Sequence, residues 1–337
     1  MRLLIDTLGA DKGAEEIVKG CVEAYDVKPY EMILVGDPDQ IMGAIPEGFK
    51  GKPDLRIIET KDYIENTDEP ALAIRRRKEA SMVMGFRALK AGEADGMLSA
   101  GSTGALLAGG TLIIGRIPKV ERAALTIISP GVDKPTIVLD VGANMDCTPN
   151  LLRQFALMGS IYAKSVFHVD RPKVGLLNIG AEKGKGNQLT KEAYDLLEQA
   201  QIQFVGNVEP RDILTTDAHV VVCDGFAGNV LLKSMEGTAQ VMLGLLKDAI
   251  YSSTRAKLGG ILVKPALSGL KQKLDYREYG AAPLLGTKQP VFKAHGSSDH
   301  IAIRNGLLAM MRFIEGDVLT EITTQMGGES DERTENS

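Results

Sequence analysis

Glycine, asparagine and lysine occur together in the stretch from Val220 to Gly237, which reads VVVCDGFAGNVLLKSMEG. An apolar run of valines breaks at Asp224-Gly225 and resumes with apolar residues at helical spacing. The break carries Gly228 and Asn229, and Lys233 lies one turn further on. Backbone amides at a helix start point outward, and glycines let an anion approach them closely. The stretch therefore predicts an anion-binding turn, although a connection that merely needs glycines explains these residues equally well.

Similar turns follow other apolar runs of the chain, at 99–104, 140–144 and 178–180. In an open α/β sheet, the turns after parallel strands gather at the carboxyl edge of the sheet, where ligands bind. The repetition favours a ligand site over a set of unrelated turns.

A second basic turn runs from Asn178 to Asn187 and places Lys185 between two glycines. Backbone of this kind can wrap closely round a ligand, and an ammonium group suits phosphate as a point charge. The turn lacks the GxxxxGK(S/T) pattern of nucleotide-binding loops, and no GxGxxG follows the first apolar run. Solvated loop charge remains the alternative interpretation of its lysines.

His295 is the best placed of the four histidines for polar chemistry, because it lies in the glycine- and serine-rich turn from Lys293 to Ser298. A single histidine in a turn is more often a structural hydrogen-bonding residue. The histidines show no metal-ligand spacing, and the chain has no GxSxG nucleophile motif. These residues predict binding of an anion and a carbonyl rather than a metal centre or a covalent nucleophile.

The composition is that of a globular protein, with 44% hydrophobic and 25% charged residues in 337. A net charge of −5 disfavours nucleic acid and requires any acidic partner to find a local basic patch, of which 75–78 (RRRK) is the densest. Three separated cysteines without a CxxC pair, and no signal peptide at the start, predict a cytoplasmic protein. The uncharged span 96–115 contains turn residues and predicts strand, turn and buried helix, not a membrane span.

Apolar runs and amphipathic stretches alternate along the chain, which predicts a mainly parallel sheet covered by helices on both faces. Helices are expected at 14–25 and 71–91, and from 225 onward. The expected strands are 3–5, 32–35, 55–58, 96–98, 124–128, 136–139, 174–177, 202–205, 219–222 and 291–292.

The stretch 252–274 differs from the rest because it mixes apolar residues with lysines and arginine. We expect Gly259-Gly260 and Pro265 to bend or interrupt this stretch. Apolar residues at a bend with basic flanks fit a surface-lying membrane contact, and a helical hairpin that packs into a dimer fits equally well. The candidate membrane-contacting residues are Leu258, Ile261, Leu262 and Val263. The polar and acidic end, 327–337, predicts disorder.

Several of these motifs together resemble one known family. The chain is similar to the PlsX family, the acyl-acyl carrier protein:phosphate acyltransferases of bacterial phospholipid synthesis. The similar segments cover nearly the whole chain: 99–109, 140–146, 178–187, 206–213, 220–237, 279–286 and 293–298. The chain departs from the family pattern at 6–11 (DTLGAD where the family resembles DAMGGD) and at Ser102, Ala181, Lys183 and Ala281.

The resemblance implies transfer of a long-chain acyl group from acyl carrier protein to inorganic phosphate, which gives an acyl phosphate for a membrane glycerol-3-phosphate acyltransferase. It implies a homodimer, peripheral membrane association and no metal or other cofactor. The implied fold is a three-layer α/β/α domain over 1–326, similar to isocitrate dehydrogenase and phosphotransacetylase, with a protruding helical pair at 237–278. A short-chain phosphotransacetylase, a nicotinamide dehydrogenase and a non-catalytic membrane scaffold are the weaker alternatives.

The expected chemistry needs no strong base, because phosphate is already an anion and a thiolate leaves readily. The enzyme must align two substrates and stabilise an oxyanion. We expect Lys185 to neutralise phosphate or the oxyanion and Asn229 to orient the carbonyl or phosphate. Asp224, Lys233 and His295 complete the predicted catalytic set. The predicted substrate-binding residues are Asp6, Gly9, Ser102, Thr103, Asn144, Asn178, Glu182, Asn187, Asn207 and Gly228.

Overall fold

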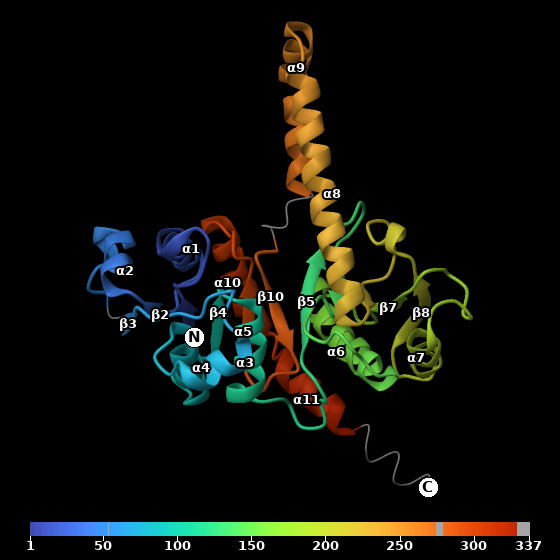
Figure 1. Ribbon diagram of the computed structural model, residues 1–337, viewed down its shortest axis with the longest axis horizontal. Helices are drawn as coiled ribbons and strands as arrows, with labels where there is room; N and C mark the ends of the chain where they lie inside the picture. The colour runs from blue at the N-terminus through green and yellow to red at the C-terminus, as the bar shows by residue number, and fades with distance from the viewer. Residues whose placement is uncertain (53, 274–278, 329–337) are drawn as a thin grey trace.

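The computed structural model describes residues 1–52, 54–273 and 279–328, with the side chains of 264–273 outside that description (Figure 1). In this part of the chain, eleven strands form one sheet in the order β3-β2-β1-β4-β11-β10-β5-β6-β9-β7-β8. The strands are β1 (Arg2–Asp6), β2 (Glu31–Gly36), β3 (Leu55–Glu59), β4 (Gly96–Ser99), β5 (Ala124–Ser129), β6 (Thr136–Leu139), β7 (Lys173–Leu177), β8 (Gln203–Val208), β9 (Val220–Val222), β10 (Ala281–Leu285) and β11 (Val291–Ala294).

The sheet consists of two parallel halves joined by an antiparallel centre. Strands β3, β2, β1, β4 and β11 are parallel, as are β6, β9, β7 and β8, whereas β10 and β5 pair antiparallel with their neighbours. The predicted, mainly parallel α/β/α fold is confirmed. Strand β10 was not predicted, because Pro283 interrupts its short apolar run and proline disfavours a strand inside a sheet.

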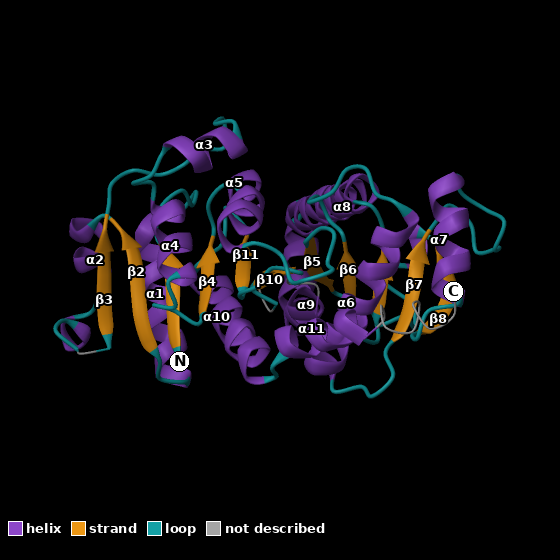
Figure 2. Cartoon of the chain, turned by 90° about the horizontal axis from the view of Figure 1, so that it is seen from below, coloured by secondary structure: helices purple, strands orange, loops and turns teal. Residues whose placement is uncertain are grey.

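Helices cover both faces of the sheet (Figure 2). Successive residues of β1 point to opposite faces: Leu3 and Ile5 pack in one apolar core, and Leu4 packs in the other. A strand buried on both faces must be apolar throughout, which explains its unbroken apolar sequence. The helices of eight residues or more are α1 (Gly13–Val27), α4 (Ser81–Lys90), α6 (Pro149–Phe167), α7 (Gln188–Glu198), α8 (Gly225–Tyr251), α9 (Thr254–Lys273), α10 (His300–Glu315) and α11 (Val318–Gly328); α2 (Pro38–Ala44), α3 (Pro70–Arg76) and α5 (Thr103–Gly109) are shorter.

The long helical region predicted at 71–91 is confirmed at both ends, but its continuity is wrong, because the chain forms α3 and α4 with a break between them. Arg77 ends α3, and its guanidinium forms ion pairs with Asp62 and Asp68. The hydroxyl of Thr60 also donates to the Glu79 carbonyl across 2.6 Å. These contacts to the preceding segment hold the backbone out of the helix, and helical spacing alone does not reveal them.

Helices α8 and α9 form a hairpin that projects from the sheet (Figure 1). The predicted interruptions at Gly259-Gly260 and Pro265 are wrong, because α9 is continuous and the chain reverses at Ser252-Ser253. A Cβ at Gly260 would lie 2.5 Å from Cγ2 of Ile250, so the glycine allows α9 to pack closely on α8. Among the described residues, no helix is long and apolar enough to cross a membrane.

The helical part of the chain ends later than the predicted start of the disordered tail. Helix α11 includes Gly327, whose carbonyl accepts a hydrogen bond from Lys119 Nζ at 2.7 Å. The predicted disordered tail therefore does not begin at 327, and its remaining part, 329–337, lies outside the described residues.

Candidate active site

The carboxyl ends of the two halves of the sheet face the same side of the molecule. In Figure 2 the arrowheads of β4 and β7 point the same way, and α5 and α8 lie above the junction between the halves. In Figure 1 the same two helices flank β10 and β5. The turns that the sequence singled out follow strands that end at this side, so the junction is the natural place for a site that uses both halves.

The first half contributes a charged cluster. Asp6 ends β1 at 1% exposure, and its Oδ2 accepts a hydrogen bond from Ser99 Oγ at 2.8 Å. Lys293 lies nearby, close to the end of β11. Its Nζ donates to the carbonyl of Ala100 at 3.2 Å and to that of Ala294. Burial lowers the pKa of Lys293 from 10.5 to about 8, against the opposing effect of Asp6 and Asp11. Burial also raises the pKa of Asp6.

Lys293 was not among the predicted site residues. It lies in the motif that drew attention to His295, at the end of a strand on the ligand-binding edge. The position of Lys293 at the ligand-binding edge was the signal in the sequence that could have identified it as a site residue. The sequence did not indicate partial burial of the lysine beside Asp6, which depends on β1, β4 and β11 being neighbours in the sheet.

Three turns of the first half lie together above this cluster. Gly9 has φ +75°, and a Cβ there would lie 3.3 Å from the Cα of Gly101. Ser102 caps α5 by accepting from the Ala105 amide at 3.5 Å, and Thr103 follows it as the first residue of the helix. The Asp11 amide donates to the carbonyl of Gly296 at 2.9 Å. The structure therefore brings Asp6, Gly9, Ser102, Thr103 and His295 onto neighbouring turns.

His295 connects this group to the second half. Its Nδ1 accepts a hydrogen bond from the Ser297 amide at 3.2 Å and lies 2.8 Å from Ser297 Oγ, which favours the tautomer with the proton on Nε2. Desolvation lowers the pKa of His295, while Glu236 and Lys233 of α8 act on it in opposite directions. Lys233 and Glu236 form an ion pair of 2.7 Å. The histidine turn and α8 thus face each other across the junction.

The turn after β6 is organised by Asp140. This buried carboxylate accepts hydrogen bonds from the amides of Leu125, Gly142, Ala143 and Asn144, and from Asn144 Nδ2. The Asn144 side chain also donates to the Ala123 carbonyl at 2.8 Å. The carboxylate of Asp140 already occupies these amides, so they are not open to an external anion; the predicted substrate-binding role of Asn144 stays a prediction.

The start of α8 is occupied in the same way. Asp224 caps the helix by accepting from the Ala227 amide at 2.8 Å, and the Gly225 amide donates to the Asn144 carbonyl at 2.7 Å. The expectation of outward, unpaired amides is therefore wrong for these two. A Cβ at Gly228 would lie 1.8 Å from the Asp140 carbonyl oxygen, so this glycine serves close packing.

Asn229 and Lys233 remain as the side chains of this stretch that can meet a ligand. Asn229 is half-buried and lies against the turn after β6, where a Cβ on Gly142 would be 3.8 Å from its Oδ1. Lys233 is exposed one turn further along α8. Lys233 lies close enough to His295 to affect its pKa, and Asn229 lies one turn before Lys233 on the same helix.

The loop between β7 and α7 is held by its own asparagines. Asn178 accepts from the Ile179 amide at 2.9 Å and donates to the Lys185 carbonyl at 3.1 Å. Asn187 caps α7 through the Thr190 amide, and Asn207 donates to the Glu182 carbonyl at 2.9 Å. These three predicted ligand-binding residues therefore have structural roles here.

Lys185 is exposed on this loop, and its side chain folds back over Gly180 beside that of Glu182. The contact with Asn207 pulls the loop toward β8, the edge strand, and Figure 2 shows it at the outer end of the sheet. Lys185 thus lies at the carboxyl edge of the sheet, as Asn229 does, but on a separate turn. That the two residues act on the same substrates remains a prediction.

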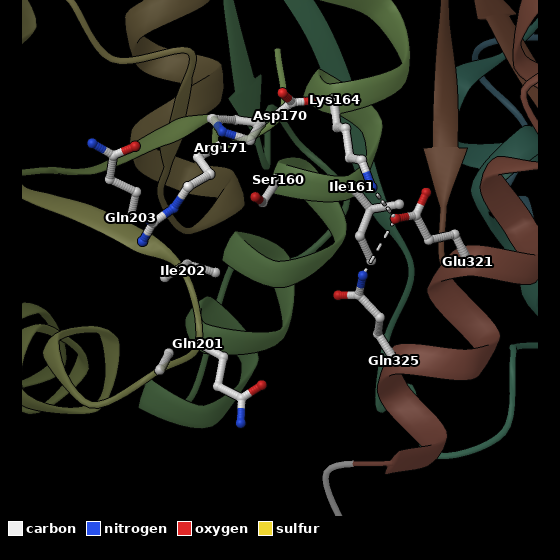
Figure 3. Close-up of a pocket in the computed structure, with 12 residues that line it drawn as sticks. Ser160, Ile161, Lys164, Asp170, Arg171, Gln201, Ile202, Gln203, Glu321 and Gln325 are labelled. Atoms are coloured by element: carbon white, nitrogen blue, oxygen red, sulfur yellow. Dashed lines mark hydrogen bonds and ion pairs between the residues drawn. The ribbon is translucent and has the colours of Figure 1, made fainter. Parts of the chain in front are cut away.

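Two cavities differ in their position relative to this edge. The larger, of about 470 Å³, is lined by Ser160, Lys164, Arg171, Gln203 and Glu321 (Figure 3). It opens where β7 and β8 begin, away from the carboxyl edge, and its Lys164 pairs with Glu321 at 3.0 Å. A second cavity, of about 370 Å³, lies between α5 and the Asn144 turn at the junction. The second cavity therefore belongs to the candidate site, and the larger does not.

Comparison with known proteins agrees with this architecture. A family model described as "Fatty acid synthesis protein" matches residues 1–321. A phosphate acyltransferase of Clostridium acetobutylicum is 47% identical over 327 residues, which cover 97% of this chain and 99% of the relative. One of Oceanobacillus iheyensis is 49% identical over 324 residues, or 96% of each chain.

Solved structures with a similar fold include a phosphotransacetylase from Streptococcus pyogenes (TM-score 0.59, 18% identity, 94% of each chain). A branched-chain phosphotransacylase from Enterococcus faecalis has a TM-score of 0.57 at 14% identity and covers 93% of this chain and 99% of its own. At these identities the likeness describes the fold alone.

Proposed function

Because the chain belongs to the fatty acid synthesis protein family that contains the phosphate acyltransferases, we propose that it transfers a long-chain acyl group from acyl carrier protein to inorganic phosphate. The observation that supports this most strongly is 47% identity to a phosphate acyltransferase across 97% of the chain. The chain is an acyltransferase, and its product, an acyl phosphate, supplies phospholipid synthesis through a membrane glycerol-3-phosphate acyltransferase.

The reaction is a substitution at the thioester carbonyl. An oxygen of hydrogen phosphate attacks the carbonyl carbon, the carbon–sulfur bond breaks, and the proton of the phosphate ends on the released thiol. The protein must hold the anion in line with the thioester and stabilise the oxyanion that forms, since each contribution is worth several kcal/mol. Cations and hydrogen-bond donors at the junction serve both purposes without a covalent intermediate.

We assign Asn229 to the carbonyl or phosphate oxygen and Lys185 to the anionic charge. His295 and Lys233 face the space between the halves and shape the site. Asp224, Asn144 and Gly228 position Asn229 by fixing the start of α8. Lys293 joins this set as the half-buried cation of the first half.

The reaction itself separates this proposal from its main alternative, a short-chain phosphotransacetylase. Purified protein is incubated with radiolabelled inorganic phosphate and either palmitoyl-acyl carrier protein or acetyl-coenzyme A. We expect labelled acyl phosphate from the carrier-protein substrate only. Acetyl phosphate formed at a comparable rate would favour the alternative, and no labelled product from either substrate would refute both.

We further propose that the α8–α9 hairpin attaches the protein peripherally to membrane lipid. Leu258, Ile261, Leu262 and Val263 are 61%, 67%, 82% and 49% exposed in the first three turns of α9, after the reversal of the hairpin and beside the exposed Lys257. Inserting such side chains contributes roughly 1.5–3 kcal/mol each at full depth, and a lysine near anionic lipid adds about 1 kcal/mol. Reversible attachment would let the acyl chain of the product enter the bilayer without crossing water.

Charge placed at the hairpin end tests this attachment. Leu262→Glu should abolish sedimentation with vesicles of phosphatidylglycerol and phosphatidylcholine while acyl phosphate formation persists. Val27→Glu is the matched control, because Val27 is 65% exposed on the body of the protein. If Leu262→Glu sediments as wild type does, the attachment is refuted. If it instead dissociates the protein into monomers and abolishes activity, the hairpin is a dimer-packing element.

Two partner assignments complete the proposal. The chain acts as a homodimer, and the exposed apolar residues at the base of α8, Phe226 and Val230, are suitable for its interface. Acyl carrier protein docks on Arg75 and Arg76 of α3, which are exposed. Arg77 is not available for docking, because Asp62 and Asp68 already pair with it. Helix α3 packs on the start of α5, where a Cβ at Gly104 would lie 2.7 Å from Pro70 Cγ, so this surface adjoins the candidate site.

A further inference from the structure

The cavity of about 370 Å³ at the junction has two arginines in its wall. Arg116 precedes β5 and forms a β-bridge with Thr287, and Arg122 lies two residues before the start of β5. The two side chains therefore come from one short segment and face one hollow. Neither residue was a candidate in the sequence, because each is an isolated arginine in a stretch without a motif.

The two guanidinium groups are not neutralised by carboxylates. In the described part of the chain, neither Arg116 nor Arg122 forms an ion pair, whereas Arg2, Arg56 and Arg77 all do. Arg122 donates to the backbone carbonyl of Asp146 at 3.2 Å, which fixes its direction and leaves other donors available. The adjacent Glu121 carboxylate accepts from Asn150 instead. Two unpaired cations on one cavity form a site for an anion.

The rest of the cavity wall is partly apolar. Leu284 and Ala123 are buried and Leu107 is half-buried, so one wall of the hollow is apolar, whereas Arg116 and Arg122 are exposed at its mouth and accessible to an anion from solvent. The buried carboxylate of Asp140 lies behind Asn144, where four amides and the Asn144 side chain already surround it.

The cavity also shares a wall with the proposed transfer site. Asn144 lines it, and the carbonyl of the same residue accepts from the Gly225 amide at the start of α8. Asn229 lies one helical turn further along α8. Only the turn that contains Asn144 would therefore separate an anion held by the arginines from Asn229, the residue assigned to the thioester carbonyl.

We propose that this cavity binds a phosphate group and that Arg116 and Arg122 are its ligands. Guanidinium groups bind phosphate oxygens with two parallel hydrogen bonds, which fixes orientation as well as charge. The inference rests on the proposed function, which offers two sources of a phosphate group: inorganic phosphate and the phosphodiester that links the prosthetic arm to acyl carrier protein.

Kinetics on Arg116→Gln, Arg122→Gln and the double variant test this site. The double variant should raise one KM at least tenfold, equivalent to about 1.4 kcal/mol, with kcat changed less. A higher KM for phosphate alone assigns the cavity to inorganic phosphate, and a higher KM for the carrier substrate alone assigns it to the phosphodiester. The two arginine-to-lysine variants should recover part of the effect. Arg171→Gln, in the larger cavity, is the matched control and should behave as wild type.

Equilibrium dialysis with radiolabelled inorganic phosphate gives a readout independent of turnover. If the cavity binds inorganic phosphate, the double variant should retain less than a tenth of the phosphate affinity of wild type. Unchanged KM values for both substrates together with unchanged phosphate binding would overturn the inference. Wild-type protein that forms no acyl phosphate would refute the proposed function, and dialysis would still decide whether the arginines bind phosphate.

Discussion

The two halves of the sheet present different kinds of polar residue at their carboxyl edges. In the second half, Asp140 and Asp224 accept hydrogen bonds from backbone amides and the Asn144 side chain donates to the Ala123 carbonyl, so all three hold the turns in place. In the first half, the buried Asp6 and the half-buried Lys293 form a charged cluster, and His295 faces α8. The second half therefore supplies rigid geometry, and the first half supplies groups whose charge can change. A glycine- and asparagine-rich turn need not be a ligand site, because its own carboxylates can occupy its amides.

The largest expected effect comes from breaking the rigid half. Gly228→Ala places a Cβ 1.8 Å from the Asp140 carbonyl oxygen and 2.8 Å from Cys223 Sγ, and these atoms belong to packed backbone and core. Backbone must move to relieve the overlap, so we expect a loss of several kcal/mol in unfolding free energy. Urea unfolding followed by circular dichroism measures this loss.

Gly237→Ala is the matched control in the same helix, because a Cβ there meets nothing within 4 Å. It should leave stability unchanged or raise it by up to about 1 kcal/mol. Equal midpoints for the two variants would show that α8 does not depend on close contact with the Asp140 turn.

The next effect concerns catalysis without loss of fold. Lys185→Ala should lower turnover by orders of magnitude, because it removes the charge assigned to phosphate, and an exposed loop lysine contributes little to stability. Asn229→Ala should show the same pattern with a smaller decrease. Both variants should unfold at the wild-type denaturant concentration.

Lys191→Ala removes an exposed lysine from the neighbouring helix α7 and serves as the control. Near-normal turnover in Lys185→Ala would remove this lysine from the site. The Arg116 and Arg122 pair would then be the main cationic candidates for phosphate.

The smallest effect is a shift in pH dependence from the charged half. The pKa of Lys293 is about 8, so activity that needs its ammonium should fall as pH rises through this value. Arginine stays charged in proteins, and Lys293→Arg should move the alkaline limb of the kcat profile to higher pH. Lys288 is an exposed lysine nearby in the sequence, so the control variant Lys288→Arg should leave the kcat profile unchanged.

The contribution of Lys293 to the free energy of unfolding should change with pH in the opposite direction to activity. Loss of activity at high pH can therefore be distinguished from unfolding. The folded pKa of Lys293 lies below its unfolded value of 10.5, so the unfolded chain binds more protons between about pH 8 and 10.5. The contribution of Lys293 to stability therefore rises with pH across this window. An alkaline limb that is identical in wild type and Lys293→Arg would exclude this lysine as its source.

The sequence predicted the fold through local patterns and missed features that arise from tertiary contacts. The apolar runs located β1, β2 and β9 because buried strands must be apolar on both faces. The break after Arg77 depends on distant aspartates, and the pairing of Gly225 with Asn144 joins two turns that are far apart in the chain. The positions of the glycine-rich turns were predicted correctly. The occupancy of their amides by Asp140 and the partial burial of Lys293 were not predicted, because both depend on which strands are neighbours in the sheet.

The central claim is that phosphate itself attacks the thioester carbon at the junction of the two halves. The most direct test is a reaction of palmitoyl-acyl carrier protein with fully ¹⁸O-labelled inorganic phosphate, followed by mass spectrometry of the product. Direct attack predicts palmitoyl phosphate that retains every labelled oxygen, including the one that bridges carbon and phosphorus. Free palmitate as the only product, or an acyl phosphate with unlabelled bridging oxygen, would contradict the claim.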